Sequence, residues 1–416
     1  MSKRLFGILA VAVVVSICAT IPAPAQRGGA APVVLPEGEG KQMVQTLCAG
    51  CHTLNNITTG WGYDKQGWDE IIASMVALPP DVRTTVSTYL GTHFSEKKRP
   101  ATVVVPGTAS VEIKEWLVPS LGSRPHDPLA ASDGSVWWTG MWSNKLGRLD
   151  PKTGVMKEFP MKTADSGPHG LTEDKDGNIW YTGNQKSMIG KLNPRTGEVT
   201  DYPMPDPAAR DPHTPGFDHN GQLWFTVQNG QKVGRLNPQT GEIKLVTMPG
   251  RWNPYGVVMT SKGVPVVCMF FTNKIASFDP VTMEMKEYTL PNEASRPRRI
   301  AITSDDTIWY ADYGRGYLGR LNLNTGEVKE WPSPSGPQSQ PYGIAAAKDI
   351  IWYVESAIRP NTLVRFDPKT EKFQSWIIPS GGNVVRNMMA TKEGDLVMAE
   401  SGVNRVAFVD VKETVK

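Results

Sequence analysis

The chain has 416 residues, which is too long for one small module and allows two or three domains or one large repeat. Hydrophobic residues make up 39%, charged residues 20%, and the mean hydropathy is −0.31, which excludes wholesale disorder and a polytopic membrane protein. The 40 Gly and 34 Pro indicate many turns and short strands. A formal net charge of only +3 gives no reason to expect a nucleic-acid partner.

Residues 1–25 have the layout of a secretory signal peptide. Two basic residues precede an apolar stretch over 5–19, and Ala-Pro-Ala at 23–25 resembles a cleavage site. The alternative, a membrane anchor, needs a longer apolar core. We therefore expect cleavage after Ala25, a periplasmic or secreted protein, and no membrane span after cleavage.

Two closely spaced cysteines mark the next feature. Residues 48–52 read Cys-Ala-Gly-Cys-His, the spacing at which two thiols add to the vinyl groups of haem and the histidine ligates the iron. The alternative is a redox-active or disulfide-bonded pair. Export favours haem, because c-type haem is attached outside the cytoplasm. We expect haem c held covalently by Cys48 and Cys51, with His52 as an iron ligand.

The flanking residues read as three short helices: one before the motif, one at 68–75, and one that begins at a Pro-Pro-Asp sequence and runs to about residue 92. Met75 is the expected sixth ligand of the iron, since a thioether there suits electron transfer. His93 and Met43 are alternatives, and Met75 could instead serve only in packing.

Residues 35–95 resemble the small class I cytochromes c that are fused to periplasmic enzymes. This resemblance implies an all-α domain that binds haem and transfers electrons. The charged and then Val/Pro-rich stretch at 96–108 has no helical period, and we expect a semi-extended linker.

From residue 109 onward the chain repeats a unit of about 43 residues. Short alternating runs surround an Asn/Asp-Pro-x-Thr-Gly turn at 145–160 and 190–203, which is typical of a β-hairpin. A second phrase, such as Asp-Gly-Asn-Ile-Trp-Tyr-Thr at 176–182, indicates another hairpin. Four short strands per repeat predict the blade of a β-propeller. The Trp of this phrase is expected between blades, at positions 138, 180, 224, 309 and 352.

The two ends of the repeat region complement each other. The last repeat lacks its outer strand, and residues 111–119 have the sequence of such a strand with no repeat before them. We predict that this strand completes the seventh blade, which removes exposed sheet edges. The expected fold is α plus all-β multidomain: a small all-α domain, then a seven-bladed β-propeller over 109–412, closed by an N-terminal outer strand. We expect a monomer.

One position of the repeat is polar and variable, and it directly follows the repeated Pro. Equivalent residues at the end of an innermost strand face the central channel of a propeller, so we expect these seven side chains to meet there. They include three of the six His of the chain: His126, His169, His213, Tyr255, Arg298, Tyr342 and Arg386.

A second position follows about 14 residues later, with acids only in blades five to seven. Glu400 is expected to approach His126 across the ring closure, with nearby Arg residues (Arg298, Arg299 and Arg386) offsetting the acids. Such a polarised channel mouth could hold a metal, an anion or a polar substrate. The alternative is a solvated channel whose charges only satisfy each other. The residues are Gly140, Gly183, Val227, Met269, Asp312, Glu355 and Glu400.

The propeller phrases resemble the virginiamycin B lyase (streptogramin lyase) family over residues 109–412. Pro-His-Gly at 168–170, the Trp phrase at 176–182 and the Asn-Pro-x-Thr-Gly-Glu turns carry the resemblance. It implies a Mg²⁺-assisted elimination that opens a cyclic depsipeptide.

The resemblance also implies catalytic positions. His213 matches the family's catalytic His, Asp211 an acid two residues before it, and His169 a His one blade earlier. The family's Glu about 14 residues after the catalytic His is here Val227, which cannot transfer a proton. We therefore expect the family's carbon–oxygen lyase chemistry to be impaired.

Three functions follow from these features. The first is electron transfer through haem c, with a propeller that binds a small polar substrate or a redox partner protein. If this protein is an enzyme, the substrate is oxidised at the channel mouth. The second is a lyase or hydrolase that uses His169, Asp211 and His213 with a divalent cation, Mg²⁺ or Ca²⁺. The third is a non-enzymatic docking propeller. We prefer the first, and expect the remaining thiol, Cys268, to be buried and inert.

Overall fold

The computed structural model describes residues 33–49, 54, 57, 63–95 and 100–412. The chain divides into two compact units: a helical one within residues 1–98 and a second that comprises residues 99–416 with 74–76. The predicted signal peptide lies outside the described residues. Among the helices described, none is long and apolar enough to cross a membrane.

The helical unit has three described helices, α1 (Lys41–Ala49), α3 (Lys65–Met75) and α4 (Pro80–His93). Pro80 occupies the first turn of α4, where a missing N–H costs nothing and its fixed φ favours the helix. The three predicted helices are therefore present. Their apolar faces meet in a small core, to which Leu35 and Ile57 contribute from outside these helices. The core comprises Leu35, Val44, Ile57, Trp68, Ile72, Val86, Tyr89 and Leu90.

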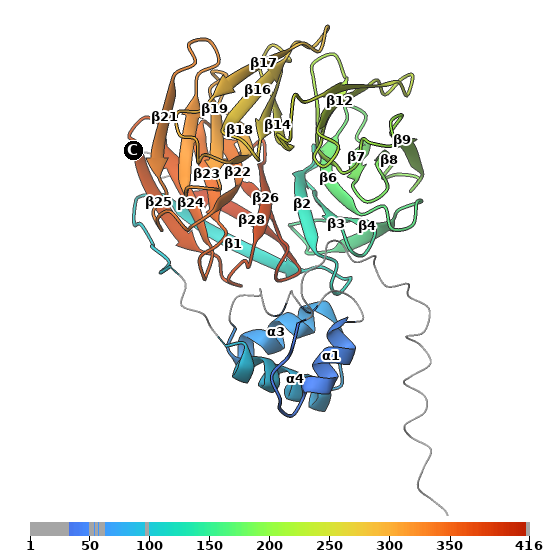
Figure 1. Ribbon diagram of the computed structural model, residues 1–416, viewed down its shortest axis with the longest axis vertical. Coiled ribbons are helices and arrows are strands. Elements are labelled where there is room, and N and C mark those ends of the chain that lie inside the picture. The colour runs from blue at the N-terminus through green and yellow to red at the C-terminus, as the bar shows by residue number, and fades with distance from the viewer. Residues whose placement is uncertain (1–32, 50–53, 55–56, 58–62, 96–99, 413–416) are drawn as a thin grey trace, which may run out of the picture. The chain divides into compact units, whose positions relative to one another are not determined.

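The second unit is a seven-bladed β-propeller, as predicted, with four antiparallel strands in each blade (Figure 1). The innermost strands are β2 (Pro125–Ala130), β6 (Pro168–Glu173), β10 (Pro212–Phe217), β14 (Pro254–Met259), β18 (Pro297–Ile302), β22 (Pro341–Ala347) and β26 (Val385–Ala390). The second strands are β3 (Val136–Gly140), β7 (Ile179–Gly183), β11 (Leu223–Val227), β15 (Pro265–Met269), β19 (Ile308–Asp312), β23 (Ile350–Glu355) and β27 (Leu396–Glu400).

Two further layers of strands complete the blades. The third strands are β4 (Lys145–Leu149), β8 (Met188–Leu192), β12 (Lys232–Leu236), β16 (Lys274–Phe278), β20 (Tyr317–Leu321), β24 (Thr362–Asp367) and β28 (Arg405–Lys412). The outer strands are β5 (Met156–Pro160), β9 (Val199–Pro203), β13 (Ile243–Thr247), β17 (Met285–Thr289), β21 (Val328–Pro332), β25 (Lys372–Ile377) and β1 (Ser110–Leu117).

The ring is closed by the N-terminal strand of the propeller. β1 pairs with β28 over its full length, from Ser110 opposite Lys412 to Leu117 opposite Arg405. The innermost strands contact one another in order, and β26 contacts β2. The predicted closure is therefore present, and it leaves the seventh blade without an exposed third strand.

A glycine in the third strand explains the recurrent Gly-Lys/Arg-Leu phrase. A Cβ on Gly190 would lie 2.1 Å from the ring of Tyr181, and one on Gly234 would lie 2.2 Å from the ring of Phe225. The aromatic residue after the repeated Trp thus lies flat on the glycine. Trp138 packs on Gly147 in the same way, so Trp138 is the equivalent of Tyr181. The equivalent of Trp180 in the first blade is therefore Trp137, and the predicted position 138 was wrong by one residue.

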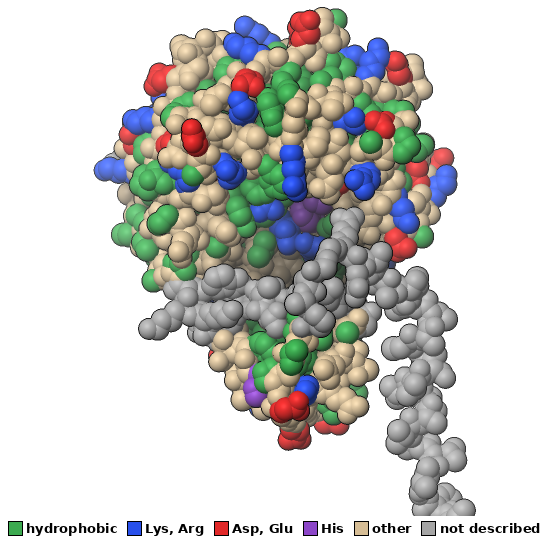
Figure 2. Space-filling view, viewed as in Figure 1, with side chains coloured by type: hydrophobic (Ala, Val, Ile, Leu, Met, Phe, Trp, Pro, Cys, Tyr) green, Lys and Arg blue, Asp and Glu red, His purple; other side chains and the backbone are tan. Residues whose placement is uncertain are grey.

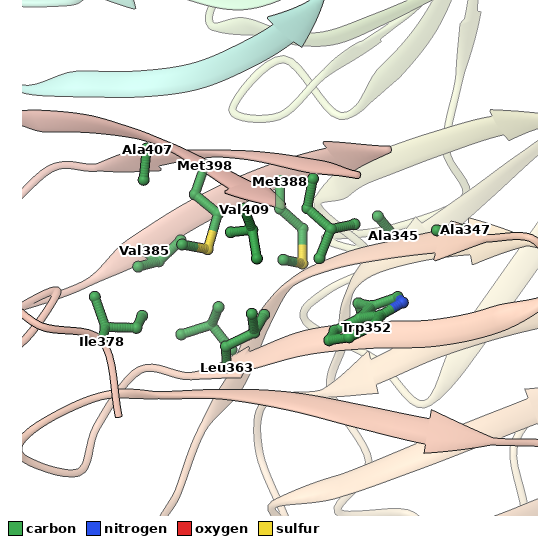
Figure 3. Close-up of a cluster of buried hydrophobic side chains, with 12 residues drawn as sticks. Ala345, Ala347, Trp352, Leu363, Ile378, Val385, Met388, Met398, Ala407 and Val409 are labelled. Carbon is green, nitrogen blue, oxygen red and sulfur yellow. The ribbon is translucent and has the colours of Figure 1, made fainter. Parts of the chain in front are cut away.

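Apolar side chains of neighbouring blades form the cores between them. Trp352 of blade six packs with Met388 and Met398 of blade seven (Figure 3). Ile113 and Val111 of β1 pack against the same cluster. The repeated tryptophans are all at most 2% exposed, as expected for positions between blades. Cys268 is fully buried in β15, and burial raises the pKa of its thiol, which keeps it protonated and inert.

The described part of the predicted linker, residues 100–108, is extended and lies along the sixth blade. Val105 exchanges hydrogen bonds with Ser375 of β25, and the Ser375 hydroxyl donates to the Val103 carbonyl at 2.9 Å. Thr102 donates to the Pro360 carbonyl at 2.8 Å. This segment therefore covers the edge of an outer strand.

Candidate functional site

The side chains that follow the repeated Pro come together at the propeller centre. Each is the second residue of an innermost strand. His126, His169 and His213 stack in series, with ring centroids 3.6 and 3.9 Å apart, and Tyr255 continues the stack at 3.9 Å. The three histidines are at most 3% exposed. Figure 2 shows a hollow in the propeller with Lys or Arg side chains and a histidine within it.

A β-bulge in every innermost strand brings a second residue to the centre. The pairing register with the neighbouring strand shifts directly after the first residue of the strand, as between Pro212 and Pro215. A bulge places two consecutive residues opposite one, so strict alternation of faces fails there. The residues that follow the first ring are Asp127, Gly170, Thr214, Gly256, Arg299, Gly343 and Asn387.

These second residues form a buried network across the ring. Arg299 of blade five donates to Asp127 of blade one at 2.7 Å and to the Thr214 hydroxyl of blade three at 3.1 Å. Asn387 donates to the other oxygen of Asp127 at 3.1 Å. His126 Nδ1 lies 2.8 Å from the same carboxylate. Asp127 and Arg299 are each 2% exposed, so this is a buried ion pair.

Threonines at the end of the second strands hold the histidines in place. Thr139 accepts a hydrogen bond from the Asp127 N–H at 3.0 Å and donates to the carbonyl of His169 in the next blade at 2.8 Å. Thr182 bridges Gly170 and His213 in the same manner. Each threonine thus satisfies a group that the bulge leaves unpaired and also joins two blades.

The histidines are neutral in this environment. Burial first, and then the positive charges of Arg386 and Arg124, hold the pKa of His126 well below its ordinary value. Burial and neighbouring histidines or arginines do the same to His169 and His213. These rings can accept or donate hydrogen bonds at neutral pH, but they are weak bases.

Arg298 occupies an aromatic cage on the other side of the ring. Its guanidinium carbon lies 3.9 Å from the ring centroid of Tyr342, 4.4 Å from Tyr313, 4.7 Å from Phe270 and 5.0 Å from Tyr255. The Tyr255 and Tyr342 hydroxyls are 2.5 Å apart. Burial raises the pKa of Tyr342, but Arg298 and Arg386 outweigh it, so the pKa lies below its ordinary value. Tyr342 is therefore the phenol best suited to release a proton here.

The acids predicted at the channel mouth instead cap loops that enter their own blades. Asp312 accepts from the Arg296 N–H at 2.9 Å, and Glu355 accepts from Ser333 and from Ser335 N–H at 2.6 and 2.8 Å. Glu400 lies beside Ser380, and burial with the neighbouring Glu115 raises its pKa. All three are 0% exposed.

The prediction that Glu400 approaches His126 is therefore not met. The charges with the largest effect on the pKa of His126 are those of arginines, and Asp127 is the carboxylate beside its ring. Each acid is the last residue of a second strand and pairs with the first residue of the innermost strand. Its side chain therefore contacts the loop that leads into that innermost strand.

Asp211 lies in the loop before β10, and asparagine side chains hold its carboxylate. It has a positive φ of 69°, and its carboxylate accepts from the side-chain amides of Asn184 and Asn229. Val227 is 0% exposed within an apolar cluster with Trp180 and Phe225.

A divalent cation does not fit the central donor set. Ligand atoms of His126, Asp127 and His169 lie within 4.8 Å of one another. Both oxygens of Asp127 already accept hydrogen bonds, one of them from the Arg299 guanidinium at 2.7 Å. Mg²⁺ and Ca²⁺ prefer several oxygen ligands, and a guanidinium at this distance repels them.

Fold and site together define a seven-bladed β-propeller of the lyase type, with a histidine stack and an excess of arginine at its centre. The chain belongs to the virginiamycin B lyase family, whose model matches residues 101–278 and 217–416. No curated protein sequence matches the chain.

Solved structures agree with this assignment. A streptogramin B lyase is 27% identical, with a TM-score of 0.66, covering 73% of this chain and 98% of that one. Virginiamycin B lyase from Staphylococcus aureus is 22% identical over 72% of this chain and 99% of its own, also at 0.66. Hydrazine synthase of Kuenenia stuttgartiensis shares only the fold, at 11% identity and a TM-score of 0.59, over 71% and 97% of the two chains.

Of the residues that follow the first ring, sequence reasoning named Arg299 and missed the others. Asp127, Thr214 and Asn387 carry the central network, and they are adjacent to the residues that were singled out. A signal was available, since this position is Gly in blades two, four and six and polar in the other four. A Cβ on Gly170 would lie 2.2 Å from the His213 carbonyl, which explains the glycine.

The buried ion pair predicts a specific pattern of stability. Asp127→Ala leaves Arg299 unpaired and should lower the free energy of unfolding by about 3–5 kcal/mol. Adding Arg299→Met should recover much of this loss, as followed by tryptophan fluorescence during urea unfolding. Arg148→Ala, which removes an exposed pair with Asp133, should cost at most about 1 kcal/mol. A double variant as unstable as the sum of its single changes would contradict this assignment.

The histidine stack predicts loss of stability in acid. The folded pKa values are depressed, so the unfolded chain binds more protons below its ordinary histidine pKa of about 6.5. Stability should be full above that pH and fall below it by up to about 1.4 kcal/mol per pH unit for each histidine. His169→Gln should give a shallower pH dependence of unfolding, and exposed His219→Gln an unchanged one. An unchanged slope in His169→Gln would rule out this origin.

Proposed function

We propose that the chain is an exported c-type cytochrome whose propeller binds a small polar substrate at its central site. The observation that carries the proposal is the Cys-Ala-Gly-Cys-His sequence that begins at Cys48, in the last turn of α1. Haem c, when bound, supplies one-electron transfer. Cys51 and His52 lie outside the described residues, and their roles rest on the motif.

The described residues fit a haem next to α1. Cys48 is half-buried and packs against the core that contains Trp68. Met43 and Leu47 lie one turn apart on α1, and each is 41% exposed. That core has only eight fully buried apolar side chains among the described residues, and so small a core usually needs a bound group for stability.

Met75 remains the proposed sixth ligand. It is the last residue of α3 and is partly exposed, so its thioether is not committed to the described apolar core. His93 stacks on Tyr89 with ring centroids 4.6 Å apart, which gives that imidazole a packing role within α4. Met43 is the other alternative.

The propeller would supply substrate binding and proton handling. Neutral imidazoles and guanidiniums can donate hydrogen bonds to a polar substrate, and Tyr342 can exchange a proton with it. A redox partner protein at the same face is the alternative within this proposal. The protein would act in the periplasm or outside the cell, as a monomer.

Family membership favours a second function, the metal-assisted lyase reaction. His169 and His213 are stacked 3.9 Å apart, as a shared site requires. Two features weigh against it: buried Val227 stands at the place of the family's Glu, and Asp211 is bound to two asparagines. A docking propeller without chemistry is the third possibility.

The haem proposal predicts one covalent haem per chain. Protein matured in a periplasm should show the c-type α band on reduction and retain haem after acid–acetone extraction. The double variant Cys48→Ala/Cys51→Ala should lose it, and Cys268→Ala should keep it. Met75→Ala should keep the covalent haem but change its absorbance spectrum. His93→Ala and Met43→Ala should keep both the covalent haem and the wild-type spectrum. A matured protein without covalent haem would refute the proposal.

The two enzymatic functions predict opposite results with a cyclic depsipeptide. Because Val227 replaces the carboxylate, the wild-type protein with Mg²⁺ should leave the streptogramin B ring closed. A small substrate of the site should instead reduce the haem in an absorbance assay, and His126→Ala should slow this. Mg²⁺-dependent ring opening that is lost in His213→Ala would establish the lyase and contradict our preference.

A further inference from the structure

We propose that the central hollow of the propeller binds a small organic anion, with a carboxylate held by Arg124, Arg298 and Arg386. This deepens the proposed function, on which it rests for the role of the site, because it names the substrate class. No cation takes part in the proposed site.

The first support is a count of charges around the histidine stack. Four guanidiniums shift the pKa of His126, those of Arg386, Arg124, Arg299 and Arg298. Only Arg299 has a carboxylate partner, Asp127. Four cations less one anion leaves three positive charges, and no described ion pair joins Arg124, Arg298 or Arg386 to an acid.

The charge of Arg124 is destabilised in this setting. Burial and Arg386 lower the pKa of Arg124 to about 9, whereas Tyr255 and Tyr342 outweigh burial and raise the pKa of Arg298. The Nε atoms of Arg298, Arg299 and Arg386 are buried and donate no hydrogen bond within the described chain. Buried donors of this kind are rarely left unsatisfied, and a bound anion would satisfy both the charge and the donors.

The arginines are also positioned for recognition. Arg124 stacks on Trp142 at 4.7 Å, and the four aromatic rings of the cage fix Arg298. All three are partly exposed, whereas the histidines beneath them are almost completely buried. The arginines are therefore the groups that an incoming ligand meets.

The aromatic cage favours an organic anion over an inorganic one. Phe270 and Tyr313 line one side of the guanidinium, with ring centroids 5.8 Å apart in an edge-to-face arrangement. A carboxylate at Arg298 would place its carbon skeleton against these rings, where apolar surface is buried favourably. The neutral imidazoles add hydrogen-bonding groups without adding charge.

Isothermal titration calorimetry on the full-length protein tests the proposal. The probes are benzoate, its uncharged counterpart benzamide, succinate and inorganic phosphate. Benzoate or succinate should bind at least tenfold more tightly than benzamide, and the affinity should fall when NaCl is raised from about 20 to about 200 mM. Phosphate that binds more tightly than both carboxylates, or carboxylates no tighter than benzamide, would overturn the carboxylate assignment.

Matched variants locate the site. Arg386→Gln removes a guanidinium that makes no hydrogen bond within the described chain, so the fold should be kept, and affinity should fall at least tenfold. Arg124→Gln should act similarly, and the exposed Arg195→Gln should bind like the wild type. Equal affinity in all three variants, with unchanged thermal midpoints, would overturn the site.

The titration does not involve the haem, so the two proposals can fail separately. Carboxylate binding by a protein that never acquires covalent haem would refute the cytochrome and leave the anion site standing. A protein that carries covalent haem but binds no carboxylate would refute the anion site and leave the cytochrome proposal standing.

Discussion

The centre of this propeller depends on one backbone constraint, the β-bulge directly after the first residue of every innermost strand. A bulge turns two consecutive side chains toward the axis, where regular strands would offer one. Two side chains from each of seven blades would be too many for the space at the axis. Glycine at the second position in blades two, four and six leaves room for the others. The backbone groups freed by the bulge are satisfied by threonines such as Thr182, which also tie each histidine to the preceding blade.

The chemical character of the centre follows from what the bulges present. Asp127 and Arg299 neutralise each other across the axis, and the remaining guanidiniums have no such partner. Buried imidazoles next to arginine stay neutral, so they contribute hydrogen bonds and little basicity. In this family member, Val227 stands where the family has a glutamate, and arginines surround the histidines. Such a site is suited to anions. This departs from the cation-assisted chemistry that the family resemblance implies.

Much of the fold could be predicted because several independent features of the sequence repeat with the same period. Hairpin turns, buried tryptophans and a repeat of 42–44 residues between ring positions together determine seven blades, and the unmatched strand at 111–119 determines the closure. The three helices around the cysteine motif were also predictable from their caps and periodicity. The assignment of Trp138 failed by one residue, because two adjacent tryptophans carry the same signal and only the packing on Gly147 separates them.

The site was predicted less well, and for a physical reason. A period of two places neighbouring residues on opposite faces, so Asp127 and Thr214 were passed over in favour of acids farther along the chain. Those acids, such as Glu355, satisfy loop N–H and hydroxyl groups, which a one-dimensional pattern does not reveal. The haem and all the residues proposed to hold it, Cys48 included, stay predictions from the sequence.

The most direct test of the account is a crystal structure of the protein soaked with bromide and Mn²⁺, with each ion identified by its anomalous scattering. The account predicts bromide among Arg124, Arg298 and Arg386 and no manganese at the histidine stack. Manganese bound by His126, Asp127 and His169, with no bromide at the arginines, would contradict it.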